Sequence, residues 1–270
     1  MSYEDVIEYS CIGKTGNDNE CEDIIVQGEH FYAVIDGVTS KYPVTYGGKS
    51  AGRYCAELLQ NAILSLDKNA ECLTALEALS NDVKKAYGED DITNENKMQA
   101  CVIIYSKQRR EVWCYGDCGL MINGRAFDHS KIIDKLMENL RAFTVSVYLA
   151  EGGDENTLYE NDIGRESILP FLKKQAIFAN KDHYFGYGVI DGTEINEKFA
   201  KVYKVNKGDR IILASDGYPK LFPTLKETEK YLEAVLINDP LSINENKQTK
   251  MKKRENLSFD DRAYFSFTVG

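Results

Sequence analysis

The stretch Lys204-Val-Asn-Lys-Gly-Asp-Arg-Ile-Ile-Leu-Ala-Ser-Asp-Gly-Tyr218 decides the fold prediction, because it reads as a turn, a buried strand and an acid at the strand's end. Turn-forming residues at 206–208 precede the apolar run 211–214, which is typical of a strand buried on both faces. We expect this strand to stop at Asp216-Gly217 and leave a carboxylate at the rim of the core. Such a carboxylate costs free energy unless a positive group meets it. Taken alone, however, the motif is more often an ordinary Asp-Gly turn than a functional site.

Two other stretches place acids at strand ends. Phe31-Tyr-Ala-Val-Ile-Asp36-Gly37 is again an apolar run that ends in Asp-Gly. Asp260 and Asp261 precede the apolar run 263–269, so these acids stand at the start of a strand. In an antiparallel sheet the end of one strand lies beside the start of its neighbour, so the three acidic stretches can converge on one edge. Clustered carboxylates repel each other, and hard divalent cations relieve that repulsion.

The order and spacing of these stretches resemble the PPM family, the metal-dependent type 2C protein phosphatases. The motifs that carry the resemblance are Glu22-Asp23, Asp36-Gly37, Gly116-Asp117, Ser215-Asp216-Gly217 and Asp260-Asp261. They spread from about residue 5 to residue 269. The segment 207–217 is the most specific of them, and the others are short.

The resemblance implies an α/β fold in one domain that spans residues 1–270. It would have a central antiparallel β-sandwich flanked by antiparallel helices, in four layers ordered α-β-β-α. A helical or flap excursion at about 128–182 would lie near the cleft, and the metal site would lie at one edge of the sandwich.

The resemblance also implies a phosphoserine and phosphothreonine protein phosphatase, with two Mg²⁺ or Mn²⁺ ions that activate a water for attack on the phosphate. The residues assigned to the metals are Glu22, Asp36, Gly37, Asp117, Asp216 and Asp260. Asp36 would bridge the two metals, and with Asp216 and Asp260 it would form the catalytic set. Whether Glu20 or Glu22 serves the second metal stays open, and Asp117 is as readily a plain turn acid as the ligand of a third ion.

The sequence departs from the family pattern at the substrate phosphate. The family often has an Arg four residues before the metal Glu, but this position is Asp18 here. Lys14 is the nearest cation and is our candidate for the phosphate. The rival cations are Lys41, Lys49 and Arg53.

Two alternative functions remain. One is a phosphatase that acts on a small phosphorylated molecule with the same metals. The other is a catalytically weak PPM-like regulatory or sensor module that binds a partner. The missing Arg favours the weak module, whereas the retention of Asp36, Asp216 and Asp260 opposes it, because clustered acids destabilise a fold that binds no metal.

Composition restricts the partners and the compartment. The chain of 270 residues has a net charge of -10 and a pI of about 5.0, which argues against nucleic acid or an anionic membrane as the main partner. No stretch approaches the ~20 apolar residues of a membrane helix. Seven irregularly spaced Cys and the lack of a signal peptide favour a cytoplasmic protein with reduced thiols.

Periodicity gives a coarse secondary structure. We expect helices at about 50–66, 70–87, 131–150, 163–178 and 224–236. We expect strands at 6–11, 23–27, 31–35, 99–106, 111–115, 119–122, 184–190, 199–205 and 263–269, besides the strand before Asp216. Asn123-Gly124 is a tight hairpin signal. The polar segment 238–256 should be exposed.

Overall fold

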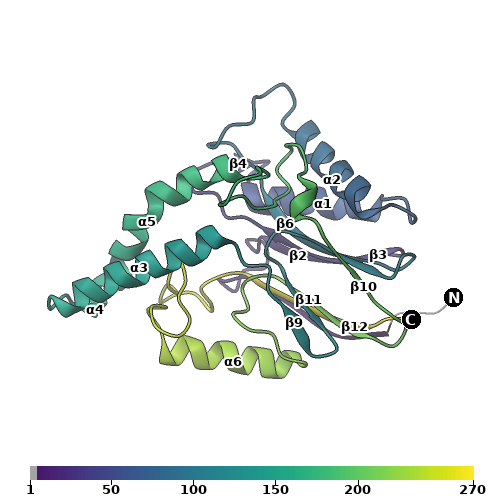
Figure 1. Cartoon of the computed structure of the whole chain (residues 1–270). Coiled ribbons are helices and arrows are strands. Elements are labelled where there is room, and N and C mark those ends of the chain that lie inside the picture. Colours follow the sequence, from purple (N-terminus) through teal and green to yellow (C-terminus); the bar gives the residue numbers. More distant parts are fainter. Residues whose placement is uncertain (1–4) are drawn as a thin grey trace.

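Two five-stranded antiparallel sheets pack face to face in the computed structural model, which describes residues 5–270 (Figure 1). The first sheet contains, in spatial order, β1 (Asp5–Ile12), β12 (Arg262–Thr268), β11 (Arg210–Ala214), β8 (Gly119–Ile122) and β9 (Arg125–Phe127). The second contains β10 (Lys201–Lys204), β7 (Glu111–Tyr115), β6 (Ala100–Ser106), β3 (Phe31–Gly37) and β2 (Asp23–Gln27). A short hairpin of β4 (Thr45–Tyr46) and β5 (Lys49–Ser50) follows β3 in the chain.

Helices cover the outer faces of both sheets. The helices α1 (Ala51–Leu64) and α2 (Cys72–Ala86) pack on the second sheet, where they share a buried apolar cluster with β2, β3 and β6. The helix α6 (Leu225–Asn238) packs on the first sheet. This confirms the four-layer sandwich, with the difference that α6 covers its sheet without the helical partner that we expected. The remaining helical segments are α3 (Ile132–Ala150), α4 (Glu155–Glu160), α5 (Ile163–Lys174), η1 (Gln175–Phe178) and η2 (Glu197–Phe199).

Strand alternation places Asp36 between the sheets. Along β3, Ala33 and Ile35 join the cluster under α1 and α2, whereas Tyr32 and Val34 join the cluster between the two sheets. Because successive side chains of a strand point to opposite faces, Asp36 continues the inner row of Tyr32 and Val34. The apolar run therefore delivers a carboxylate to the edge of the inner core.

Side-chain caps set the starts of two helices, and the predicted tight turn at Asn123-Gly124 is confirmed. Ser50 is the N-cap of α1, and its hydroxyl accepts from the backbone N–H of Arg53 at 3.3 Å. Thr224 caps α6 in the same way. Asn123 and Gly124 have φ values of 50° and 81°, as the tight turn between β8 and β9 requires.

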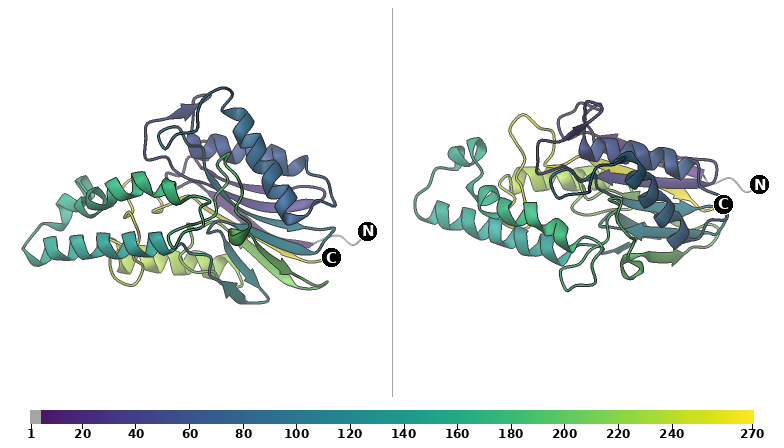
Figure 2. Two further views of the ribbon diagram at one scale, coloured as in Figure 1. Left: turned by 45° about the horizontal axis from the view of Figure 1, so that its top comes forward. Right: turned by 90° about the horizontal axis from the view of Figure 1, so that it is seen from above.

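The predicted excursion forms an arm that extends beyond the sheets (Figures 1 and 2). It contains α3 and α5, which pack on each other, and the short α4, which the sequence did not predict. The expectation that 238–256 is exposed is wrong. Leu241 and Met251 are buried in a cluster with Val145 of α3, and the buried guanidinium of Arg141 donates to the Leu241 carbonyl at 3.0 Å. The polar segment folds onto the arm because its backbone carbonyls, such as that of Leu241, accept hydrogen bonds from the buried cation Arg141.

The predicted strand at 184–190 is also wrong. Ala179 with Tyr187, and Ala100 with Ile190, form single bridges there. The backbone N–H of Gly186 donates to the His183 carbonyl, so the segment turns on itself before a ladder can form.

The chemistry of the thiols agrees with prediction, since all seven Cys are free and only Cys11 is not fully buried. None of the helices within residues 5–270 combines the length and the apolar character that a bilayer crossing needs. The cytoplasmic location and the single domain over 1–270 stay predictions, and residues 1–4 lie outside the described part.

Candidate active site

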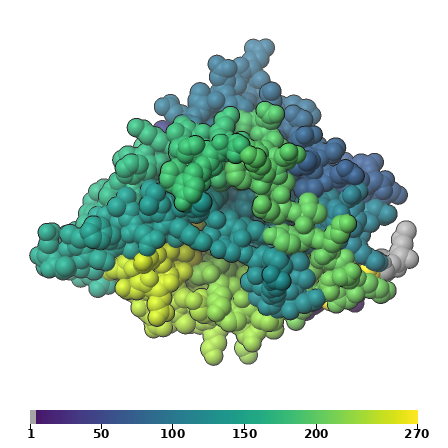
Figure 3. All heavy atoms as spheres, viewed as in Figure 1, coloured from purple at the N-terminus to yellow at the C-terminus, as the bar shows by residue number. Residues whose placement is uncertain are grey.

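A cleft of about 610 Å³ opens at the edge of the sandwich where β3, β7 and β11 end. Its walls come from both sheets, from α3 and α5 of the arm, and from the segment before β12. In the space-filling view the surface is hollowed beside α3 (Figure 3). The elements that the sequence predicted to converge therefore surround one cavity.

Three predicted acids meet in this cleft and form what we call the acid cluster. Asp36 ends β3, Asp117 lies in the turn between β7 and β8, and Asp216 follows β11. Each offers a carboxylate oxygen that lies within 4.8 Å of those of the other two. The backbone N–H of Asp216 donates to Asp36 Oδ2 at 3.4 Å, which ties the two sheets together at this point.

The acids of the cluster destabilise each other's ionised forms. Burial, followed by the charge of Asp216, raises the pKa of Asp36 well above its usual value. Burial within the cleft walls, followed by the charge of Asp117, raises the pKa of Asp216 to about 7. Burial opposes ionisation of Asp117 as well, but Lys131 lies 2.6 Å away and its charge lowers the pKa of that carboxyl. The cluster thus holds negative charge that one half-buried lysine only partly balances.

Asp23 is an additional acid of the cleft. It lies directly opposite Asp36 in the pairing of β2 with β3 and is 3% exposed, so it is not a solvated surface acid. Burial raises the pKa of Asp23. Its Oδ2 atom has no hydrogen-bond partner among the described residues. A buried, unpartnered carboxylate oxygen next to other carboxylates fits the all-oxygen ligand set that hard divalent cations prefer.

Asp260 lines the cleft at the start of β12 but lies outside the 4.8 Å group. It forms ion pairs with Lys250 at 2.5 Å and with Lys14 at 3.5 Å. Burial raises the pKa of Asp260, but Lys250 and then Lys14 outweigh this effect, so the pKa lies below its usual value.

Gly37 also lines the cleft, at the end of β3. A Cβ at this position would lie 2.5 Å from the Gly52 carbonyl oxygen and 2.6 Å from that of Glu22. The close approach of β3 to the start of α1 therefore requires glycine. The role of its carbonyl as a metal ligand stays a prediction.

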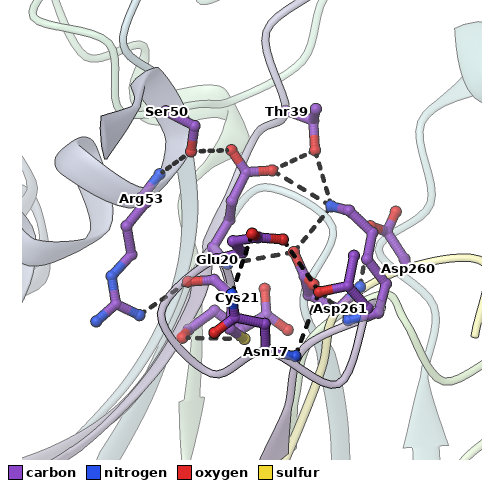
Figure 4. Close-up of polar contacts among 12 residues, drawn as sticks. Asn17, Glu20, Cys21, Thr39, Ser50, Arg53, Asp260 and Asp261 are labelled. Carbon is purple, nitrogen blue, oxygen red and sulfur yellow. Dashed lines mark hydrogen bonds and ion pairs between the residues drawn. The ribbon is translucent and has the colours of Figure 1, made fainter. Parts of the chain in front are cut away.

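Glu22 is buried and is not among the residues that line the cleft. Its carboxylate accepts from the hydroxyls of Ser50, at 2.6 Å, and Thr39. Figure 4 labels Ser50 and Thr39 and draws these two contacts as dashed lines. The alternative, Glu20, is exposed and accepts from Thr15 and Asn17. The assignment of Glu22 to the second metal stays a prediction, and among the acids at 20–23 it is Asp23 that lines the cleft.

Lys14 also lies outside the lining. Its backbone N–H donates to Asp261 Oδ1 at 2.7 Å, and its ammonium donates to Asp261 Oδ2 at 2.9 Å. The ammonium lies 3.5 Å from Glu22. Burial lowers the pKa of Lys14, but the charges of Asp260, Asp261 and Glu22 outweigh it and raise the pKa above its usual value. In this structure Lys14 fastens its loop to Asp261, and its predicted contact with a phosphate stays a prediction.

Sequence reasoning missed Lys131 and Arg165 as cleft residues and undervalued Asp23. Asp23 pairs directly with Asp36 across the hairpin of β2 and β3. Counting residues outward from the turn of this hairpin was a usable signal for Asp23. No comparable signal exists for Lys131 and Arg165, because their positions depend on how the arm folds back.

No protein-family model matches the sequence, and no curated protein matches it. Solved structures do match. The serine/threonine phosphatase Stp1 from Staphylococcus aureus superposes with a TM-score of 0.50 at 11% identity, covering 100% of this chain and 96% of that one. The PstP/Ppp phosphatase of Mycobacterium tuberculosis gives 0.48 at 16% identity, covering 98% and 99%. The catalytic domain of PstP in complex with 2 manganese ions gives 0.49 at 14% identity, covering 98% of each chain. The match to Stp1 shows that this chain has the same fold over its full length, which is the fold that the resemblance implied.

Proposed function

We propose that this chain is a metal-dependent phosphatase of the PPM type that hydrolyses phosphoserine and phosphothreonine in proteins. The observation that carries the proposal is the acid cluster, whose three carboxylates approach within 4.8 Å of one another in an open cleft. The fold supports it, since Stp1, which shares this fold, is a serine/threonine phosphatase.

The residues present fit divalent cations. Asp36, Asp117 and Asp216 would hold them, with Asp23 and Asp260 beside the cluster in the same cleft. Carboxylate oxygens favour Mg²⁺ or Mn²⁺. Two ions, with a third at Asp117, are part of the proposal. When bound, such ions supply Lewis-acid stabilisation to phosphate oxygens and make a water more acidic.

The chain's own residues preorganise this site. Lys131 fixes Asp117, and the N–H of Asp216 fixes Asp36. Asp261 accepts from the N–H groups of Lys14 and Glu22, so the loop before β2 is tied to the start of β12. These contacts hold the carboxylates in place before any ligand arrives, which reduces the cost of assembling the site.

The open cleft suits a phosphoryl group presented on the surface of another protein. The sensor module and the small-molecule phosphatase stay alternative predictions, and no contact or distance among residues 5–270 favours either.

The test is hydrolysis of an aryl phosphate and of phosphoserine and phosphothreonine peptides with Mn²⁺, with and without chelator. We expect turnover of all three substrates in Mn²⁺ and none in chelator. Absence of metal-dependent turnover on every substrate would overturn the proposal, whereas turnover of the aryl phosphate alone would favour a small-molecule phosphatase.

A further inference from the structure

Three cations from separate parts of the chain line the cleft, and we call them the basic cluster. Lys41 lies in the loop after β3, Arg165 in the first turn of α5, and Lys250 in the segment before β12. Arg165 Nη1 donates at 2.9 Å to the carbonyl of Thr249, the residue before Lys250. Lys250 pairs with Asp260, so the basic cluster adjoins the acidic part of the cleft.

Lys41 and Arg165 have no carboxylate partner among the described residues. The Lys41 ammonium donates to the Thr39 carbonyl, and the Arg165 guanidinium to Thr249. Burial, followed by the charges of Lys250 and Arg165, lowers the pKa of Lys41 to about 7. Cations that are half-buried and gathered without counter-charge cost free energy. An anion that enters the cleft would remove this cost.

The other cations of the cleft are already engaged. Lys131 pairs with Asp117, and Lys135 with Asp128 at 3.2 Å. Lys220 lies over an aromatic ring, with its ammonium 5.1 Å from the Phe222 ring centre. Outside the lining, the rival phosphate candidates from the sequence, Lys49 and Arg53, both pair with Glu57.

We propose that Lys41 and Arg165, adjoined by Lys250, bind the phosphoryl group of the substrate, in place of the arginine that the family pattern puts before the metal glutamate. This inference rests on the proposed function. A phosphate monoester is a compact dianion, and the planar guanidinium of Arg165 can donate two hydrogen bonds to it. The consequence is that the arm completes the substrate site, because α5 supplies Arg165.

The experiment measures binding of inorganic phosphate by calorimetry in saturating Mn²⁺, together with KM and kcat on an aryl phosphate. The variants are Lys41→Met, Arg165→Met and the double variant. Lys174→Met is the matched control, because Lys174 lies exposed on α5 and outside the cleft lining. Circular dichroism establishes that each variant is folded, and Arg165→Lys replaces Arg165→Met if the latter does not fold.

Each single variant should weaken phosphate binding about tenfold, and the double variant should weaken it about a hundredfold, as expected for lost hydrogen bonds from charged groups. KM should rise by similar factors with little change in kcat, because these contacts exist in the ground state as well as the transition state. The control should match the wild type, and Arg165→Lys should lose less affinity than Arg165→Met.

The outcomes separate this inference from the proposed function. Suppose that the wild type hydrolyses the aryl phosphate and that the folded variants, Arg165→Lys included, keep the phosphate affinity and KM of the wild type. The basic cluster is then not the phosphate site, but the proposed phosphatase function is retained. If the wild type is inactive but the variants lose phosphate affinity as stated, the anion site is supported and the proposed phosphatase function is not. Equal losses in the Lys174→Met control would also overturn the inference.

Discussion

The loop 13–22 and the wall of the cleft handle charge in opposite ways. In the loop, the ammonium of Lys14 contacts Asp261, Asp260 and Glu22. In the cleft, Lys131 pairs with Asp117 and Lys250 with Asp260, but like charges also gather there. Asp216 beside other acids and Lys41 beside other cations have pKa values that both move to about 7. Paired charges stabilise a fold, whereas gathered like charges destabilise it. The difference indicates that the loop is built for the fold and the cleft wall for ligands of both signs.

The largest expected effect is on the acid cluster. Asp36→Asn removes the charge at the point where the two sheets meet, so metal-dependent hydrolysis should fall at least about a hundredfold, as for other transition-state contacts. The melting temperature in chelator should stay level or rise, because an uncharged amide at this position would end the repulsion with Asp216. Asp18→Asn, at an exposed acid of the loop, is the control and should keep full activity. Wild-type turnover in Asp36→Asn would refute the assignment of the site.

Divalent metal should stabilise the folded chain. Ions that bind the acid cluster of the native state raise its stability by about 2.7 kcal/mol at a metal concentration of about 100 times the dissociation constant. Thermal melts in chelator and in millimolar Mn²⁺ measure the shift, and Asp36→Asn should show little of it. Identical melting temperatures in the two conditions would mean that the cleft holds no cation.

Lys14→Met should destabilise the fold by about 2 kcal/mol, because it leaves Asp261 and Glu22 buried without their counter-charge. Urea unfolding of the variant in chelator measures this, with the exposed Lys68→Met as the control. A loss no larger than that of the control would mean that the loop does not depend on this pairing.

The last effect concerns Lys41 and has the opposite sign. Its pKa is about 7 in the folded chain, where burial and the charges of Lys250 and Arg165 outweigh Asp260 and Glu22. The unfolded value is about 10.4, so the folded state binds fewer protons between these limits and its stability rises with pH there. The free-energy cost of holding a charged Lys41 in the folded state is therefore fully present below about pH 7 and absent above about pH 10.4.

Lys41→Met should consequently melt at a higher temperature than the wild type at pH 6, and the gain should shrink as the pH rises towards about 10. Thermal melts of both proteins across this range provide the comparison. A variant that melts lower than the wild type at pH 6 would show that Lys41 stabilises the fold.

The acids could be predicted from sequence because their placement is local. An apolar strand that ends in Asp-Gly fixes where its carboxylate emerges. Asp36 ends β3 of one sheet and Asp216 follows β11 of the other, so the face-to-face packing of the two sheets brings these two acids together. The sequence left the second metal open between Glu20 and Glu22, whereas Asp23 is the acid of this stretch that lines the cleft. Side chains alternate along a strand, so an uncertainty of one residue in where β2 starts exchanges the two faces.

The basic cluster could not be predicted for a different reason. Arg165 and Lys250 reach the cleft through the packing of α5 on α3 and the folding of 239–251 onto the arm. That packing depends on contacts such as the buried Arg141 with the Leu241 carbonyl, which join residues far apart in the chain. Neither periodicity nor turn signals carry this information, and the polarity of 238–256 pointed to an exposed segment.

The most direct test of the account is the anomalous scattering of crystals soaked in Mn²⁺. We expect anomalous peaks in the cleft, at coordinating distance from the carboxylates of Asp36 and Asp216. Saturating Mn²⁺ that gives no peak in the cleft, or peaks only elsewhere on the molecule, would contradict the central claim that these acids form a metal centre.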